Sequence, residues 1–167
     1  DDDHDDHDEH GHAEGLLEAN YMQQNAELDG YELEIGRIFN LDNGDLEVSF
    51  GRDVVNGTLA DGMNIPRLSP ARNIYSVKYF ANDYLFDLSF KDVDDQKDVA
   101  EEETPTMGYQ MLDTKLVKTF DLNGNSLRVS VFANNLLDEV ARNHSSFVKN
   151  QVPLPGRNYG IRFNLTF

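Results

Sequence analysis

The sequence predicts an all-β fold, a transmembrane antiparallel β-barrel, and three observations lead to this prediction. The first is the end of the chain, residues 157–167, where apolar side chains alternate with polar or small ones. The apolar set carries no charge and consists of Tyr159, Ile161, Phe163, Leu165 and Phe167. Because lipid tolerates no charge at mid-depth, this set fits a lipid-facing surface better than the inner face of a small soluble sandwich.

The second observation is the alternation of connection lengths between the predicted strands. Short links at 40–45, 82–83 and 121–125 alternate with long ones at 59–70, 92–106 and 135–156. Bacterial outer-membrane barrels have short periplasmic turns at one rim and long external loops at the other. The pattern therefore predicts a periplasmic C-terminus and an extracellular position for the first residues.

The third observation is that the composition excludes a transmembrane helix but is compatible with transmembrane β-strands. The chain has no run of 18 apolar residues, but a barrel strand needs only about 9 to 11 residues, half of them apolar. With 31 acidic and 14 basic residues, the net charge of −17 disfavours nucleic acid and favours cations. Because the chain has no cysteine, any metal has to be held by imidazole and carboxylate.

The first four strands are predicted at 16–39, at 45–58, at 71–81 and from Tyr84 onward. In each, apolar residues alternate with polar ones, so the two sets face opposite sides of the sheet. The lumen-facing set is expected to be solvated or to pair with Arg128 and Arg162, and it includes Glu32, Glu34, Glu47 and Asp87. Between the first two strands, Asn43-Gly44 predicts a type I′ hairpin turn, whose central residues both need positive φ.

The last three strands are predicted at about 107–120, around 127–134 and at 157–167. The fifth is the least regular, Asn123-Gly124 predicts the turn after it, and Phe132 breaks the alternation of the sixth. Single-chain bacterial barrels have an even number of strands, and an open edge in lipid leaves backbone groups unpaired. We therefore expect about seven C-terminal strands of a larger barrel.

Residues 1–15 form a separate segment ahead of the strands at 16–167. Its first fourteen residues include eight acids, four histidines and no base, a composition that cannot pack a core.

The candidate metal ligands are His4, His7, His10, His12, Asp5 and Asp8. Zinc takes three or four such ligands at about 2.0–2.2 Å, but ordering a mobile loop costs about 1–2 kcal/mol per residue. The segment is therefore expected to capture cations rather than hold one tightly; copper should compete, and acid should release the ion. The alternative is a solvated acidic loop that binds nothing specifically.

Other candidate sites are weaker. His144 is the only histidine after the first segment, and a lone loop histidine is expected to be exposed. The acidic turns 42–45 and 121–125 lack the twelve-residue ligand pattern of a calcium loop, and hairpin turns explain them better. No nucleophile, base and orienting acid are evident, so we do not expect an enzyme.

Four segments resemble TonB-dependent outer-membrane receptors. They are Ala-Asn-Asn-Leu-Leu-Asp at 133–138, Pro-Leu-Pro-Gly-Arg-Asn at 153–158, the strand that ends at Phe167, and Ile-Pro-Arg-Leu-Ser-Pro at 65–70. Together with the His/Asp-rich segment, the pattern is most similar to zinc-uptake receptors of the ZnuD type.

The resemblance implies a barrel of about 22 strands in the bacterial outer membrane, with an N-terminal plug and import driven by the TonB complex. Zinc would be the transported ligand, and no organic cofactor is expected. Expected partners are the remaining N-terminal strands and plug, the TonB complex, outer-membrane lipid and lipopolysaccharide, and the barrel-assembly machinery through Phe167. The alternatives are a receptor for haem or a siderophore and, in another class, a soluble acidic calcium-binding β-domain.

Overall fold

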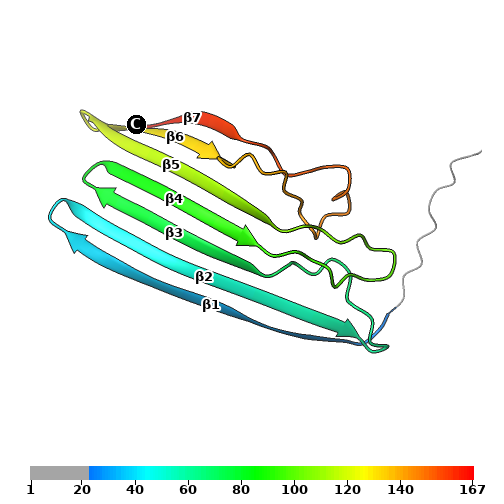
Figure 1. The fold of residues 1–167 in the computed structure, drawn as a ribbon. Helices are drawn as coiled ribbons and strands as arrows, with labels where there is room; N and C mark the ends of the chain where they lie inside the picture. The colour runs from blue at the N-terminus through cyan, green and yellow to red at the C-terminus, as the bar shows by residue number, and fades with distance from the viewer. Residues whose placement is uncertain (1–22) are drawn as a thin grey trace, which may run out of the picture.

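The computed structural model describes residues 23–167 and contains one seven-stranded antiparallel sheet (Figure 1). The strands are β1 Ala26–Leu41, β2 Gly44–Leu59, β3 Arg72–Ala81, β4 Tyr84–Val93, β5 Tyr109–Leu122, β6 Asn125–Asn134 and β7 Asn158–Thr166. Their order in the sheet is their order in the chain, so every connection is a hairpin between neighbours. The all-β antiparallel prediction is confirmed.

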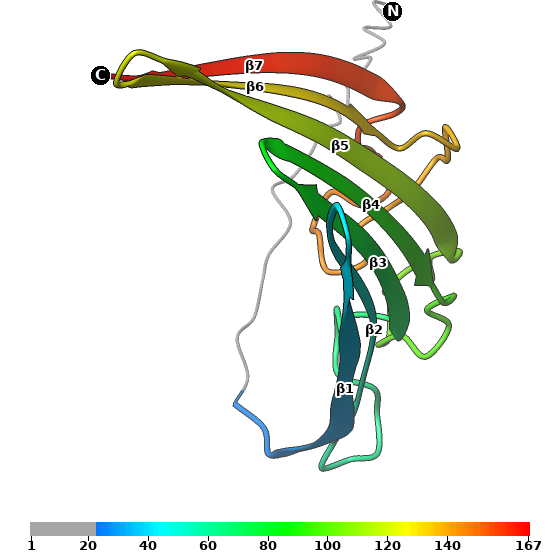
Figure 2. The ribbon, with the colours of Figure 1, turned by 90° about the vertical axis from the view of Figure 1, so that its left-hand side faces the viewer.

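The sheet is a single curved layer (Figure 2), and within 23–167 no second sheet covers either face. Along this part of the chain β1 pairs only with β2 and β7 only with β6, so the sheet is open. Its buried apolar residues are few, namely Val93, Val117, Ala133 and Ala141. The alternative of a soluble calcium-binding β-domain implies a sandwich of two packed sheets, which the described residues do not form. The described residues include no helix long and apolar enough to span a membrane.

The two edges at which the strands reverse differ, as predicted. Two-residue loops at 42–43, 82–83 and 123–124 lie at one rim, and the long loops at 60–71, 94–108 and 135–157 lie at the other (Figure 1). The C-terminus lies at the rim with the tight turns. The long-loop rim therefore gathers three segments that are distant in sequence.

Two predictions at the start of the sheet need correction. Within the described residues the first strand begins at Ala26, because 23–25 are irregular. The predicted part at 16–22 lies outside the described residues. The first turn is Asp42-Asn43, one residue earlier than Asn43-Gly44, whereas the predicted Asn123-Gly124 turn has positive φ at both positions, 56° and 95°. Gly44 is instead required for close packing, since a Cβ there would overlap the carbonyl oxygen of Phe80 on β3.

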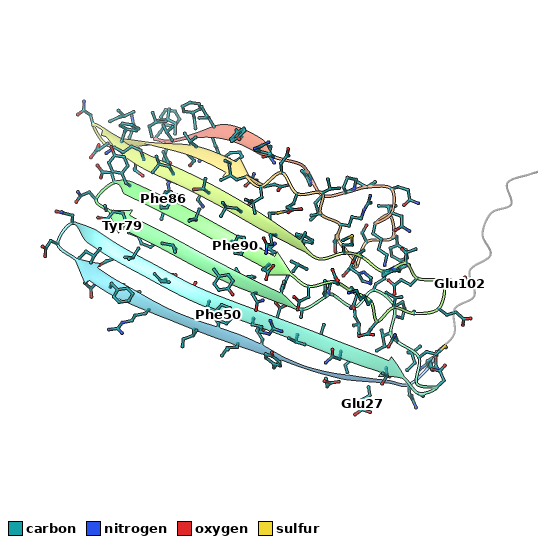
Figure 3. All side chains as sticks on the ribbon, in the orientation of Figure 1. Glu27, Phe50, Tyr79, Phe86, Phe90 and Glu102 are labelled. Atoms are coloured by element: carbon teal, nitrogen blue, oxygen red, sulfur yellow. The ribbon has the colours of Figure 1, made fainter. Side chains whose placement is uncertain are left out.

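One face of the sheet is apolar across every strand. A row of directly paired residues crosses it and consists of Phe39, Leu46, Tyr79, Phe86, Leu116, Val131 and Ile161. Two further rows on the loop side continue it on β2 to β4 with Val48, Val77 and Leu88, and then with Phe50, Tyr75 and Phe90. We call these three rows the apolar belt; Phe50, Tyr79, Phe86 and Phe90 are labelled in Figure 3.

Aromatic rings stabilise the belt through cross-strand contacts. The ring centroids of Phe50 and Tyr75 lie 5.1 Å apart, and those of Tyr75 and Phe90 lie 6.0 Å apart, both in tilted arrangements. Among the described residues, the one charged residue paired directly with a residue of the belt is Arg37 on the edge strand β1, opposite Val48; its guanidinium lies 4.9 Å from the ring centroid of Phe39.

The opposite face is polar and carries a row of alternating charges. Glu47, Lys78, Asp87 and Lys115 lie side by side on β2 to β5. Lys78 contacts Glu47 at 3.4 Å, and Lys115 contacts Asp87 at 3.5 Å. The structure places these carboxylates on the face opposite the apolar belt. Glu47 and Asp87 pair with lysines rather than with Arg128 or Arg162, because antiparallel register sets those lysines opposite them.

The irregular residue Phe132 also lies on the polar face, directly opposite Gly160 of β7. A Cβ at Gly160 would overlap the Phe132 ring, so the ring covers the glycine backbone. We expect Gly160→Ala to cost about 1–3 kcal/mol of unfolding free energy, because the ring has to move. Urea unfolding of the protein in detergent measures this. In a Phe132→Ala background the same change should cost less than half as much, and an equal cost would refute the contact.

Candidate functional site

The predicted metal ligands of the N-terminal segment lie outside the described residues. These are His4, His7, His10, His12, Asp5 and Asp8. Within 23–167, no group of three or more His, Asp or Glu side chains is arranged to hold a metal ion. The features available for a site are therefore the long-loop rim and the polar face.

At the long-loop rim His144 is buried, with 2% of its surface exposed, so the prediction of an exposed loop histidine is wrong. Its Nε2 lies 3.1 Å from Oε1 of Glu103, and its Nδ1 lies 2.9 Å from Oγ1 of Thr106. Nζ of Lys149 lies 3.4 Å from both ring nitrogens. We call Glu103, Thr106, His144 and Lys149 the loop clasp.

Glu103 is the centre of the clasp because its carboxylate binds groups from all three long loops. Nζ of Lys149 donates to it at 2.7 Å from loop 135–157. The backbone N–H of Arg67 donates at 3.1 and 3.2 Å from loop 60–71, and that of Ala100 donates at 3.3 Å from its own loop. One carboxylate, whose side chain is 10% exposed, thus contacts all three loops.

Burial and charge shift the titration of the clasp. Burial lowers the pKa of His144, and the Lys149 ammonium lowers it further, while Glu103 acts in the opposite direction. Burial alone would raise the pKa of Glu103, but the hydrogen bonds from Lys149 and from the backbone of Arg67 and Ala100 lower it. At neutral pH the clasp therefore holds a neutral imidazole between one anion and one cation.

The chain of contacts Thr106, His144, Glu103 connects a hydroxyl, an imidazole and a carboxylate, as in a catalytic triad. Sequence reasoning missed it, because the three residues come from two loops. Thr106 is only 6% exposed and Lys149 contacts both ring nitrogens, so no substrate can reach the hydroxyl. Ser145 does not take part in this series of contacts, since its hydroxyl contacts that of Ser69 at 3.2 Å. The contacts of Thr106, His144 and Glu103 therefore join loop 94–108 to loop 135–157.

The segments 133–138 and 153–158, which carry the receptor resemblance, meet at the base of loop 135–157. Asn135 is 1% exposed; its amide donates to the carbonyls of Glu139 and Pro155 at 2.9 and 3.1 Å and accepts from the Glu139 N–H at 3.0 Å. Arg157 donates to Asp138 from its backbone and its guanidinium, each at 3.1 Å. These motif residues close the loop.

The polar face has a hollow of about 330 Å³ near β4 to β7. Its lining residues are Asp87, Ser89, Asp113, Thr114, Lys115, Phe132, Asn134 and Arg162. Asp87 already pairs with Lys115, and Asp113 accepts the backbone N–H of Asn135 at 2.8 Å. Because both carboxylates are engaged with other groups, the hollow offers no convergent set of ligands for a cation.

Comparison with known proteins identifies the architecture. No protein-family model matches the sequence, and no curated protein matches it. A solved structure, that of the copper transporter OprC, superimposes with a TM-score of 0.69 at 18% sequence identity, over 86% of this chain. The fold is that of a β-barrel wall. The chain spans 24% of the length of OprC, about a quarter of it.

Proposed function

We propose that the chain is part of an outer-membrane receptor that imports a transition-metal cation, with zinc as the expected ion. The observation that carries the proposal is the apolar belt. Its residues lie on one uncovered face of a sheet that has almost no core. The last strand continues this apolar face, and its residues Ile161, Phe163 and Phe167 are 63%, 66% and 92% exposed. Apolar area of this extent is unfavourable in water, and lipid removes the cost.

The metal assignment is supported by two independent features. The N-terminal segment supplies four imidazoles among carboxylates, and the fold is similar to that of a copper transporter. The strand β1 begins at the long-loop rim (Figure 1), because its first residue, Ala26, pairs with Leu59 beside loop 60–71. A segment that precedes β1 is therefore suited to capture a cation at that rim. Plug, remaining strands, lipopolysaccharide and TonB complex are the expected partners, and no catalytic step is assigned.

The proposal is tested by titrating zinc and copper into the intact receptor in detergent. Changing His4, His7, His10 and His12 to alanine should weaken binding of both ions at least about tenfold, which is about 1.4 kcal/mol. A matched control changes the exposed Asp98 and Glu101 to alanine and should leave affinity within about twofold, since carboxylates alone bind these ions weakly.

Equal affinities of the four-histidine variant and the native receptor would remove the segment from metal capture. Copper should bind more tightly than zinc, so growth decides which ion is imported. Dependence on the receptor under zinc limitation supports zinc, dependence under copper limitation supports copper, and dependence under iron limitation alone would favour a haem or siderophore receptor.

A further inference from the structure

We propose that the loop clasp is operated by protons: protonation of His144 releases loop 94–108 from loop 135–157 at the long-loop rim. The clasp is buried, with side-chain exposures of 1% for His144, 7% for Lys149 and 10% for Glu103. It joins residues that are 38 and 46 positions apart in the chain. The protonation state of the clasp therefore controls the contact between two loops that are distant in sequence.

The neutral form of His144 satisfies every polar group in the clasp. With the proton on Nε2, the ring donates to Glu103, and its Nδ1 accepts from the hydroxyl of Thr106. Lys149 and Glu103 then carry one positive and one negative charge in direct contact. The buried site is electrically balanced.

A second proton on the ring disturbs this balance. It takes the Nδ1 lone pair from the Thr106 hydroxyl, and it sets a second cation 3.4 Å from the Lys149 ammonium with a single carboxylate to compensate both. The other groups close by add no negative charge. Arg67 and Ala100 reach Glu103 through backbone N–H groups, and the Arg142 guanidinium donates to the Lys149 carbonyl. An uncompensated buried charge is costly, so protonation favours an open, hydrated arrangement.

The pH window follows from the direction of the shift. Since the closed clasp lowers the pKa of His144, the closed form is favoured fully above about pH 6.5, the ordinary value in an open loop, and loses stability as pH falls below it. The lowered pKa of Glu103 acts only at lower pH, below its own ordinary value near 4.5. Acid release between these limits depends on the histidine.

The other contacts between and within these loops determine which parts of them separate. The two loops are also joined by the Thr104 hydroxyl donating to Asn150 at 2.9 Å, an exposed contact that is too weak to hold them alone. The base of loop 135–157 is held by Asn135, which does not titrate. The tips of the loops should therefore separate while the base stays closed.

The test uses spin labels on the receptor in lipid bilayers, at cysteines introduced in place of Glu101 and Val148. Both residues are exposed, and the chain itself contains no cysteine. Between about pH 7.5 and pH 5.5 the label distance should lengthen and broaden, and the open fraction should rise by at most about tenfold per pH unit, the limit for one proton. An unchanged distance would overturn the proposal.

Variants separate the proton effect from general loosening. Glutamine at 144 can donate to Glu103 and accept from Thr106 without binding a proton, so His144→Gln should stay closed at about pH 5.5. Lys149→Gln removes the repelling cation and should also resist acid. Lys97→Gln, which removes an exposed lysine paired with Asp95 on the same loop, is the control and should open as the native receptor does.

If His144→Gln opens on acidification as the native receptor does, the histidine is not the trigger. Should that variant fail to fold, the opening midpoint of the native receptor still decides: a midpoint between about pH 4.5 and 6.5 supports the proposal, and a lower one assigns the effect to carboxylates and overturns it. The result is independent of which metal the receptor imports.

Discussion

Arginine in place of Leu88 is expected to destabilise the folded barrel in lipid by about 2–4 kcal/mol, the cost of a basic side chain near the bilayer midplane on the lipid face. Leu88 lies in the apolar belt on β4, between Val77 of β3 and Thr114 of β5. Its side chain faces the surface that we assign to lipid. The change introduces charge there without altering any turn or loop.

The matched control is arginine at the next residue, Ser89. Because side chains alternate along a strand, Ser89 faces the polar side, between Ser76 and Asp113, at the hollow beside β5. Ser89→Arg should change stability by less than about 1 kcal/mol, since the arginine side chain enters the polar hollow, where its charge lies beside the Asp113 carboxylate. Guanidinium unfolding of the protein in phospholipid vesicles measures both variants. Equal losses would refute the assignment of the belt to lipid.

Alanine in place of Asn135 is the second change with a large expected effect. It leaves the Glu139 N–H and the carbonyls of Glu139 and Pro155 without their partner in a site that is 1% exposed. An unsatisfied buried group costs about 1–3 kcal/mol, so we expect a loss of about 2–4 kcal/mol after partial hydration. Hydrogen exchange should rise first in loop 135–157, whose base this residue closes.

Two further variants identify the cause of that loss. Asn135 has a φ of 51°, which alanine tolerates poorly, so Asn135→Gly tests the hydrogen bonds without the backbone strain. It should remain destabilised by more than about 1 kcal/mol. Asn150→Ala removes a single exposed hydrogen bond with Thr104 and should change stability by less than about 0.5 kcal/mol. If the glycine variant were as stable as the native protein, strain rather than hydrogen bonding would explain the loss.

Much of the sheet follows from local sequence. The alternation of apolar and polar residues assigns each side chain to a face, as the Leu88 and Ser89 pair shows. The Asn123-Gly124 turn needs positive φ at both central residues, which only a few residue types supply cheaply. The Asn43-Gly44 pair has the same signal, but the turn is Asp42-Asn43, and Gly44 lies in β2 against the backbone of Phe80 on β3.

What the sequence determined by itself was the set of strands, their two faces and the alternation of tight turns with long loops, because period two and turn chemistry act over a few neighbouring residues. Only the tertiary structure decided the burial of His144, its contacts with Glu103, Thr106 and Lys149, and the meeting of Asn135 with Pro155. Those residues are brought together by strand pairing, which sets loops distant in sequence side by side at one rim. The composition and spacing of residues within one loop do not determine which other loop it contacts at that rim.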